Sequence, residues 1–154
     1  MADLTQIINY RAIDDSLATS GQPTEAQLQA IAESGFEIVI NLGVTGDPRY
    51  SLPDEAASTH ALGLEYVHIP VAFAAPTEQD LLKFCDAMDA SSRRKRFVHC
   101  AANKRVTAFL GLYRVIRLRW DLTPAFEPMS TVWAPDATWQ AFIDEMLRKA
   151  GAPG

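Results

Sequence analysis

The sequence contains few cysteines and no long apolar run. Only Cys85 and Cys100 occur in 154 residues, which excludes a disulfide-stapled scaffold and fits a reducing compartment. No stretch of about 18 consecutive apolar residues is present, so no membrane span is predicted. Residues 1–14 lack a basic segment followed by an apolar one, so we expect no signal peptide. These absences predict a cytoplasmic protein that has no membrane partner.

An excess of positive charge is also absent. The 14 Lys and Arg residues are outnumbered by 19 Asp and Glu residues, which gives a net charge of −5. Such a balance does not attract nucleic acid, so we expect no nucleic-acid partner. The hydrophobic share of 48% and the charged share of 21% are ordinary for a globular protein. The length predicts a single domain over residues 1–154, with residues 151–154 as a frayed tail. The sequence does not indicate an oligomeric state.

Short apolar runs alternate with amphipathic segments along the chain. Strands are predicted at 36–42, 64–71 and 97–100, with two edge strands at 7–13 and 17–20. Helices are predicted at 24–33, 53–62, 77–88, 104–119 and 135–149. This alternation predicts an α/β fold with a mostly parallel central sheet and helices on both faces. Ligands bind such sheets beyond the carboxyl ends of the strands, so we look for chemistry just after residue 100.

A loop of small residues joins the predicted strand ending at Cys100 to the next helix. Free backbone N–H groups and the helix dipole at such a junction bind anions and favour the thiolate form of a cysteine. Arg105 adds a forked, permanently charged clamp for an anion. A thiolate beneath an anion cradle can hydrolyse phosphate esters. Cys85, in contrast, lies on the apolar stripe of a predicted helix and is expected to be inert.

The pair His99-Cys100, followed by a short loop and Arg105, resembles the signature of cysteine-dependent protein tyrosine and dual-specificity phosphatases. More narrowly, the chain resembles a bacterial phosphatase-like group that is also found fused to β-lactamase-like hydrolases. Further segments that carry this resemblance are 20–24 (Ser-Gly-Gln-Pro-Thr), 39–42, 63–71 and 133–139. The resemblance covers nearly the whole chain and implies a dual-specificity-phosphatase-like fold.

The same resemblance implies a mechanism and a set of site residues. Cys100 would be the nucleophile, form a phosphocysteine intermediate and work with Arg105 as the phosphate clamp. The phosphate cradle would consist of the backbone N–H groups of Ala101, Ala102, Asn103, Lys104 and Arg105. His99 would order the loop from behind. The implied substrate is a phosphorylated small molecule or a phosphoprotein, with phosphotyrosine as one option. Neither a metal nor another cofactor is expected.

The spacing of the motif leaves two alignments open. The family has five residues between Cys and Arg, whereas this chain has four. In the first alignment, which we favour, the loop is one residue shorter and Arg105 still points inward, because an uncompensated thiolate would be costly to bury. In the second, Val106 replaces the arginine and Thr107 takes the position of a hydroxyl that bonds the thiolate. The second alignment predicts a weak or inactive pseudophosphatase that binds phosphate or a phosphorylated partner.

The loop after Cys100 also lacks glycine. Ala101 and Ala102 cannot enter positive φ without strain, whereas asparagine tolerates it. We therefore place the tightest turn at Asn103. A rhodanese-like sulfurtransferase would use a similar cysteine loop, but the Ser-Gly-Gln-Pro segment argues against that class.

A general acid is missing where the family usually has one. The loop at 72–76 contains no carboxylate. Glu78 and Asp80 are better explained as acids in the first turn of a helix, and Asp47 is a further candidate. Asp136, in a Trp-Ala-Pro-Asp segment, is expected to begin a helix instead. Because losing a general acid costs roughly 10² to 10⁴-fold in rate, activated esters should be the best substrates.

Overall fold

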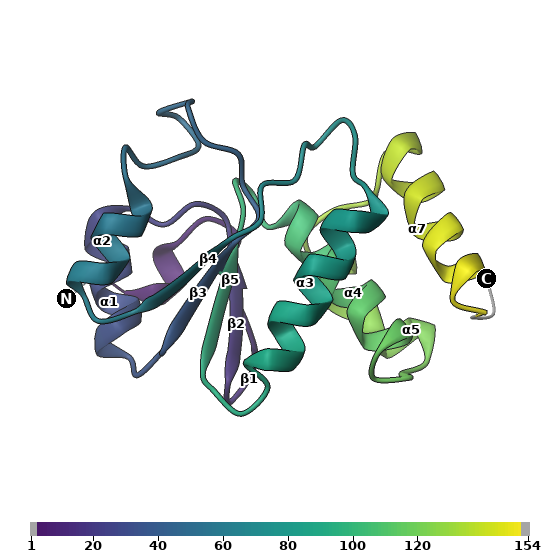
Figure 1. The fold of residues 1–154 in the computed structure, drawn as a ribbon, viewed down its shortest axis with the longest axis horizontal. Coiled ribbons are helices and arrows are strands. Elements are labelled where there is room, and N and C mark those ends of the chain that lie inside the picture. Colours follow the sequence, from purple (N-terminus) through teal and green to yellow (C-terminus); the bar gives the residue numbers. More distant parts are fainter. Residues whose placement is uncertain (1–2, 152–154) are drawn as a thin grey trace.

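The computed structural model describes residues 3–151 and contains a five-stranded sheet between two layers of helices (Figure 1). The strands are β1 (Arg11–Asp14), β2 (Leu17–Ser20), β3 (Ile38–Asn41), β4 (Glu65–His68) and β5 (Arg96–His99). Their order is β1-β2-β5-β3-β4; β1 runs antiparallel to β2, and all other neighbours are parallel. The predicted α/β fold with a mostly parallel sheet is confirmed. The predicted tail falls largely on residues 152–154, which lie outside the described residues.

The N-terminal strands differ from the prediction in two respects. β2 is not an edge strand: it pairs with β1 on one side and β5 on the other, and all four of its residues are buried. Residues 7–10 are not part of a strand, and a short 3-10 helix, η1 (Leu4–Gln6), precedes them. Whether a four-residue strand has one neighbouring strand or two depends on long-range pairing. A local sequence pattern carries no information on such pairing.

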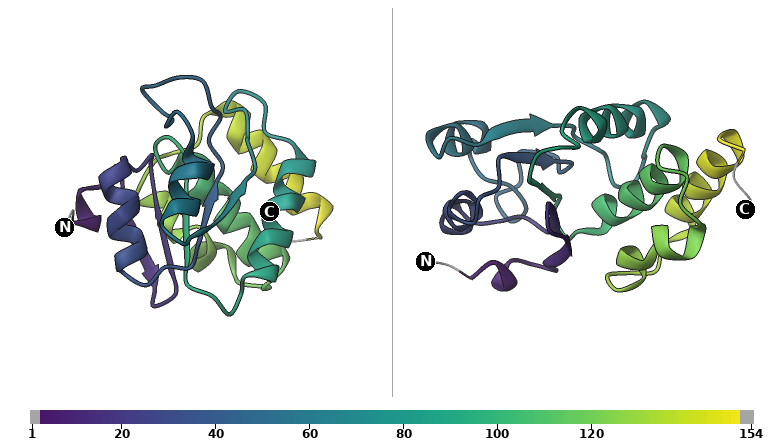
Figure 2. Two further views of the ribbon diagram at one scale, coloured as in Figure 1. Left: turned by 60° about the vertical axis from the view of Figure 1, so that its left-hand side comes forward. Right: turned by 90° about the horizontal axis from the view of Figure 1, so that it is seen from below.

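Helices cover both faces of the sheet, as predicted (Figure 2). One face carries α1 (Glu25–Glu33) and α2 (Glu55–Ala61), and the other carries α3 (Glu78–Ala90), α4 (Lys104–Ile116), α5 (Leu122–Ala125), α6 (Glu127–Ser130) and α7 (Ala137–Lys149). The sequence did not predict α5 and α6, because four-residue helices are too short for a periodic pattern. Between residues 3 and 151, no helix has the length and apolarity needed to cross a bilayer.

Alternating side chains of the central strands build the two halves of the core. In β5, Phe97 packs with the α1 side while Val98 packs with the α3–α7 side, which is the two-residue period of a strand buried on both faces. On the larger side, Phe109 of α4 contacts Trp139 and Phe142 of α7. Burial of each such side chain contributes roughly 1.5–3 kcal/mol. This packing holds the end of β5, and therefore Cys100, in a fixed position.

Candidate active site

The loop between β5 and α4 has free backbone donors beside Cys100. α4 begins at Lys104, and Asn103 before it adopts a left-handed conformation with φ of 66°, as predicted from the missing glycine. Ala102 forms an isolated antiparallel bridge with Gly21. Within residues 3–151, the backbone N–H groups of Ala101, Lys104 and Arg105 donate no hydrogen bond to another backbone group. These donors and the positive end of the α4 dipole therefore remain available for an anion.

Two asparagines fasten this loop to the N-terminal segment. The Asn103 amide donates to the Asn9 carbonyl at 2.8 Å and to the Thr19 hydroxyl at 3.0 Å. In return, the Asn9 amide donates to the Ala102 carbonyl at 3.0 Å. Sequence analysis did not identify Asn9, because 93 residues separate it from its partner. Asn103 thus provides the tight turn and also a tether that glycine could not supply.

The Ser-Gly-Gln-Pro segment packs directly against the cysteine loop. The Cys100 N–H donates to the Ser20 carbonyl at 3.3 Å, and the Gln22 N–H donates to the Ala101 carbonyl at 3.0 Å. A Cβ atom on Gly21 would lie only 2.4 Å from the Ala101 carbonyl oxygen. Only glycine fits this close approach of two backbones, which explains why the Ser-Gly-Gln-Pro segment has glycine at position 21.

His99 lies behind the loop in a buried polar cluster. Its Nε2 atom is 2.5 Å from Oε2 of Glu55, and its Nδ1 atom is 3.3 Å from the Cys100 carbonyl oxygen. The second oxygen of Glu55 accepts a hydrogen bond from the Gln22 amide at 2.8 Å. Burial alone would raise the pKa of Glu55, but the hydrogen bonds from His99 and Gln22 and the charge of His99 lower it on balance. Glu55 is therefore a buried carboxylate that holds His99 in place.

Sequence analysis missed Glu55 as a site residue. It stands in the first turn of α2, directly after the capping Asp54, where an acid is normally explained by the helix dipole. Its burial, with an exposed fraction of 6%, is a property of the tertiary structure.

Arg105 lines the same cavity as Cys100. Its guanidinium donates one hydrogen bond to the Val71 carbonyl at 2.7 Å and lies 5.9 Å from the centre of the Phe73 ring. Val106 is fully buried in the core instead of facing the cavity. These positions favour the alignment with the shorter loop.

Thr107 supports α4 and does not contact the cysteine. Its hydroxyl donates to the carbonyls of Asn103 at 2.8 Å and Lys104 at 3.1 Å. The alternative in which this hydroxyl bonds the thiolate does not fit that geometry. Its role here is to close the first turn of the helix that carries Arg105.

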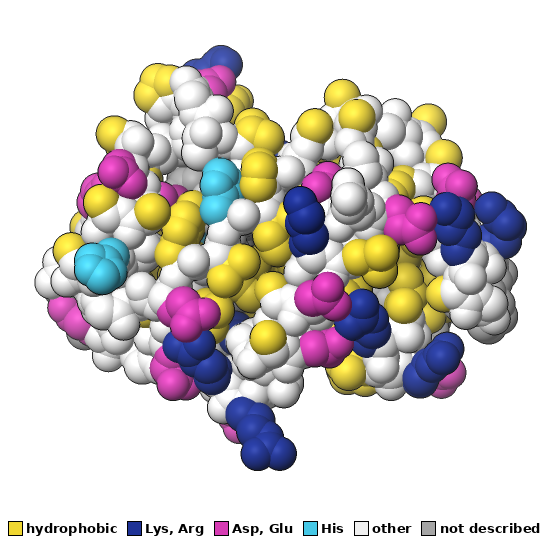
Figure 3. All heavy atoms as spheres, viewed as in Figure 1, with side chains coloured by type: hydrophobic (Ala, Val, Ile, Leu, Met, Phe, Trp, Pro, Cys, Tyr) yellow, Lys and Arg dark blue, Asp and Glu magenta, His cyan; other side chains and the backbone are white. Residues whose placement is uncertain are grey.

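A cavity of about 620 Å³ opens above Cys100. Three segments line it: the cysteine loop, the β3–α2 loop with Val44, Asp47 and Tyr50, and residues 72–74 after β4. In Figure 1, the β3–α2 loop and the loop after β4 both lie beyond the carboxyl ends of the strands. Figure 3 shows the surface hollowed between these two loops, with hydrophobic side chains on the walls. The cavity is thus a mostly apolar recess with a cationic, donor-rich floor.

Of the acids considered from the sequence, Asp47 alone lines this cavity. Two side-chain hydrogen bonds from Arg49 lower the pKa of Asp47. Glu78 pairs with Lys149 at 2.9 Å, and the Asp80 N–H is capped by Thr77. Asp136 accepts a hydrogen bond from the Trp139 N–H and caps α7, as predicted. No cluster of three or more His, Cys, Asp or Glu side chains suited to a metal occurs in the described part of the chain.

Comparisons with known proteins agree on one family. A family model described as "DSP-PTPase phosphatase fused to NAD+ Kinase" matches residues 8–131. The "Beta-lactamase hydrolase-like protein" of Xylella fastidiosa (strain Temecula1) is 33% identical over 106 residues, which cover 68% of this chain and 24% of that protein. This chain therefore spans about a quarter of the length of such curated relatives.

Solved structures show the same fold. A DUF442 protein from Shewanella putrefaciens CN-32 superimposes with a TM-score of 0.83 and 30% identity over 96% of both chains. The P. aeruginosa protein TpbA, in complex with pTyr, superimposes with a TM-score of 0.71 and 16% identity over 99% of this chain and 95% of its own. The second likeness establishes the fold alone.

Proposed function

We propose, because the chain belongs to the family of DSP-PTPase phosphatases fused to NAD+ kinase, that Cys100 hydrolyses phosphate monoesters through a phosphocysteine intermediate. The predicted membership of the dual-specificity and tyrosine phosphatase superfamily is confirmed. The observation that carries the proposal is the cavity floor, which Cys100 and Arg105 line together with a loop that has unpaired backbone N–H groups.

The proposed reaction has two displacements. The Cys100 thiolate attacks phosphorus, the P–S bond forms, and the ester P–O bond breaks with its electron pair going to the leaving oxygen, which takes a proton from solvent. A water molecule then attacks the phosphocysteine, gives up a proton, and releases inorganic phosphate and the thiolate. Arg105 and the N–H groups of residues 101–105 stabilise the negative charge on the phosphoryl oxygens in both steps.

The walls of the cavity favour an aromatic phosphate ester. Val44, Tyr50 and Phe73 are exposed hydrophobic side chains, and all three line this cavity. An aryl group can pack against these side chains, whereas a polyphosphorylated polar ligand would need more cations than Lys104 and Arg105 provide. Phosphotyrosine on a peptide and other aryl phosphates are thus the proposed substrate class.

The experiment is hydrolysis of para-nitrophenyl phosphate by wild type, Cys100→Ser and Arg105→Ala, with Cys85→Ser as the matched control. We expect no turnover by Cys100→Ser, normal turnover by Cys85→Ser, and a loss of about 10² to 10³-fold for Arg105→Ala, because it removes a donor to the transferring group. Rapid quenching of wild type should trap phosphate on Cys100. A wild type that binds vanadate yet shows no turnover and no phosphocysteine would refute the enzyme and leave a binding module.

A further inference from the structure

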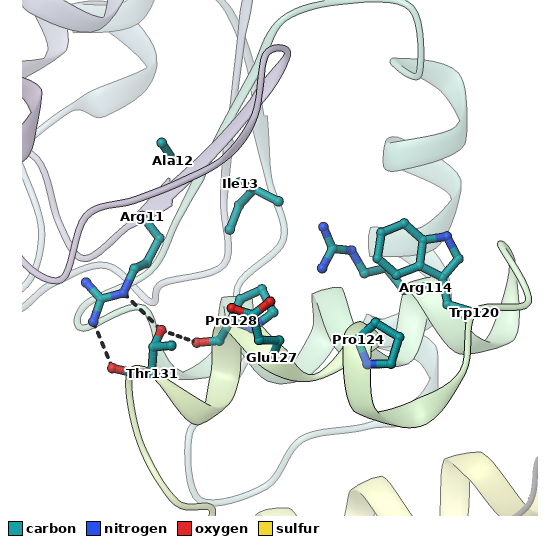
Figure 4. A pocket seen from close by; sticks show the side chains of 9 residues that line it. All are labelled: Arg11, Ala12, Ile13, Arg114, Trp120, Pro124, Glu127, Pro128 and Thr131. Atoms are coloured by element: carbon teal, nitrogen blue, oxygen red, sulfur yellow. Dashed lines mark hydrogen bonds between the residues drawn. The ribbon is translucent and has the colours of Figure 1, made fainter.

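A second cavity, of about 340 Å³, is lined by residues 11–13 and by residues between 114 and 131. It is formed by β1, the last turn of α4, and the α5–α6 segment (Figure 4). Arg105 and Arg114 are nine residues apart on α4, which places the two cavities roughly 14 Å apart along the helix axis. This second cavity shares no lining residue with the first.

Arg114 is buried in this cavity without a partner. Its exposed fraction is 7%, and its guanidinium carbon lies 4.2 Å from the centre of the Trp120 ring. Across residues 3–151, its side chain forms no hydrogen bond and no ion pair. In Figure 4 the guanidinium projects into the cavity beside Trp120, and no dashed line reaches it. Burial lowers the pKa of Arg114, and Asp14 and Glu127 offset this only in part.

The other buried or neighbouring arginines each have at least one hydrogen bond, although the buried Nε atom of Arg96 has no partner. Arg96 donates to the Met88 carbonyl and Arg105 to the Val71 carbonyl. Arg11, in the same cavity, has hydrogen bonds to the Thr131 hydroxyl, the Thr131 carbonyl and the Tyr10 carbonyl. A guanidinium has five donors, and burying it unpaired is unfavourable. Among these four arginines, Arg114 is the one with no side-chain hydrogen bond in the described residues, and its nitrogens are not among the fully buried atoms, so they remain accessible from the cavity.

The remaining walls define which acceptor fits. Ile13, Pro124 and the Trp120 ring form apolar surfaces around the guanidinium. Glu127 also lines the cavity, and its negative charge disfavours a phosphate dianion more than a carboxylate monoanion. A planar carboxylate matches the forked geometry of the guanidinium and can accept two parallel hydrogen bonds.

We propose that this cavity binds a small carboxylate with an apolar or aromatic body, held by Arg114 and stacked near Trp120. The carboxylate oxygens accept the Arg114 donors, and the body of the ligand packs against Pro124 and Ile13. The inference holds whether or not Cys100 is a nucleophile, because it uses none of the cysteine-site residues.

The test is a benzoate titration followed through the three tryptophan indole N–H signals by NMR, with the Trp120 signal assigned by Trp120→Phe. Trp120 reports on this cavity, whereas Trp133 contacts Lys104 and Phe73 and reports on the cysteine site. We expect benzoate to move the Trp120 signal saturably, Arg114→Met to weaken the affinity at least about tenfold, and Arg114→Lys to weaken it less. The control Arg117→Met, which removes two surface ion pairs, should bind like wild type.

Four results would overturn the proposal. One is that Arg114→Met binds benzoate as tightly as wild type, while its unchanged Trp133 and Trp139 signals show that the variant is folded. Another is that neutral benzamide moves the Trp120 signal as strongly. A third is that benzoate moves only the Trp133 signal. A response to inorganic phosphate as strong as that to benzoate would exclude the carboxylate class.

Discussion

At the scale of single residues, the two buried cysteines of this chain lie in different surroundings. Cys85 is packed in the core on α3, and burial raises its pKa to about 11. Cys100 directly follows β5, and although it is also buried, it lines the cavity next to free backbone N–H donors. The thiolate is the nucleophile, so a raised pKa suppresses reactivity at neutral pH.

Alkylation should therefore be selective. We expect iodoacetamide at neutral pH to modify Cys100 and to leave Cys85 unmodified, with inorganic phosphate slowing the reaction. Peptide mass spectrometry of the folded protein checks this. Modification of Cys85 at a similar rate would contradict the assignment of roles, and unfolded protein, in which both thiols react, serves as the control.

Glu55 is the residue whose removal should show most clearly how the loop is supported. Because the folded pKa of Glu55 is lowered, its contribution to the free energy of unfolding is present above its unfolded pKa of about 4.3 and is lost as pH falls through the folded pKa. Glu55→Gln should lower stability at neutral pH by about 1–3 kcal/mol and reduce the loss of stability on acidification.

Urea unfolding at pH 7 and below pH 4.3 (about the unfolded value) measures both effects. Glu33→Gln, on the exposed surface of α1, is the matched control and should leave both curves as in wild type. An acid-dependence of Glu55→Gln equal to that of wild type would mean that another group dominates this region.

At the scale of elements, the connection between β5 and α4 determines which side chain of α4 faces the cavity. A loop with one residue fewer than the family norm still presents Arg105 to the cavity, because Asn103 turns the backbone at positive φ and is tethered on both sides. The helix then starts at once, and Thr107 closes its first turn.

Substitutions at Asn103 should separate the turn from the tether. Asn103→Ala forces alanine into the left-handed region at a cost of about 1–2 kcal/mol and removes both side-chain hydrogen bonds. Asn103→Gly keeps the turn and loses only the tether, so we expect its unfolding free energy to lie between those of wild type and Asn103→Ala. Urea denaturation of the three proteins decides this; equal stability of the glycine and alanine variants would show that the turn is unimportant.

At the scale of the whole molecule, three separate segments create the cavity, and none of them presents a protonated carboxylate over Cys100. Asp47 lines the cavity, but hydrogen bonds from Arg49 lower its pKa, which disfavours the protonated form that a general acid needs. The loop at 72–76 is held instead by a hydrogen bond that the Trp139 indole N–H donates to the Phe73 carbonyl at 2.7 Å.

This arrangement predicts strong leaving-group dependence. Rates for a series of aryl phosphates should fall steeply as the pKa of the departing phenol rises. Asp47→Asn should change kcat far less than the roughly 10² to 10⁴-fold typical of a lost general acid. Steady-state kinetics with substituted phenyl phosphates measures both, and a large loss in Asp47→Asn confined to poor leaving groups would identify Asp47 as the acid.

Local information in the sequence was sufficient for the layers of the fold. Strand–helix alternation is a local pattern, so periodicity and turn preferences reveal it. The His99-Cys100 pair pointed to the site through its resemblance to a known signature. The preference of asparagine for positive φ also predicted the turn at Asn103, which φ of 66° confirms.

Tertiary structure alone decided which distant residues meet at the site. Glu55 beneath His99 and Asn9 beside Ala102 depend on contacts between segments tens of residues apart. It also favours the alignment with the shorter loop, because α4 leaves the loop in a direction that places Arg105 on the cavity wall and Val106 in the core. Local propensity specifies each element, but burial and hydrogen bonding across the sheet fix how the elements are placed, and that placement makes the site.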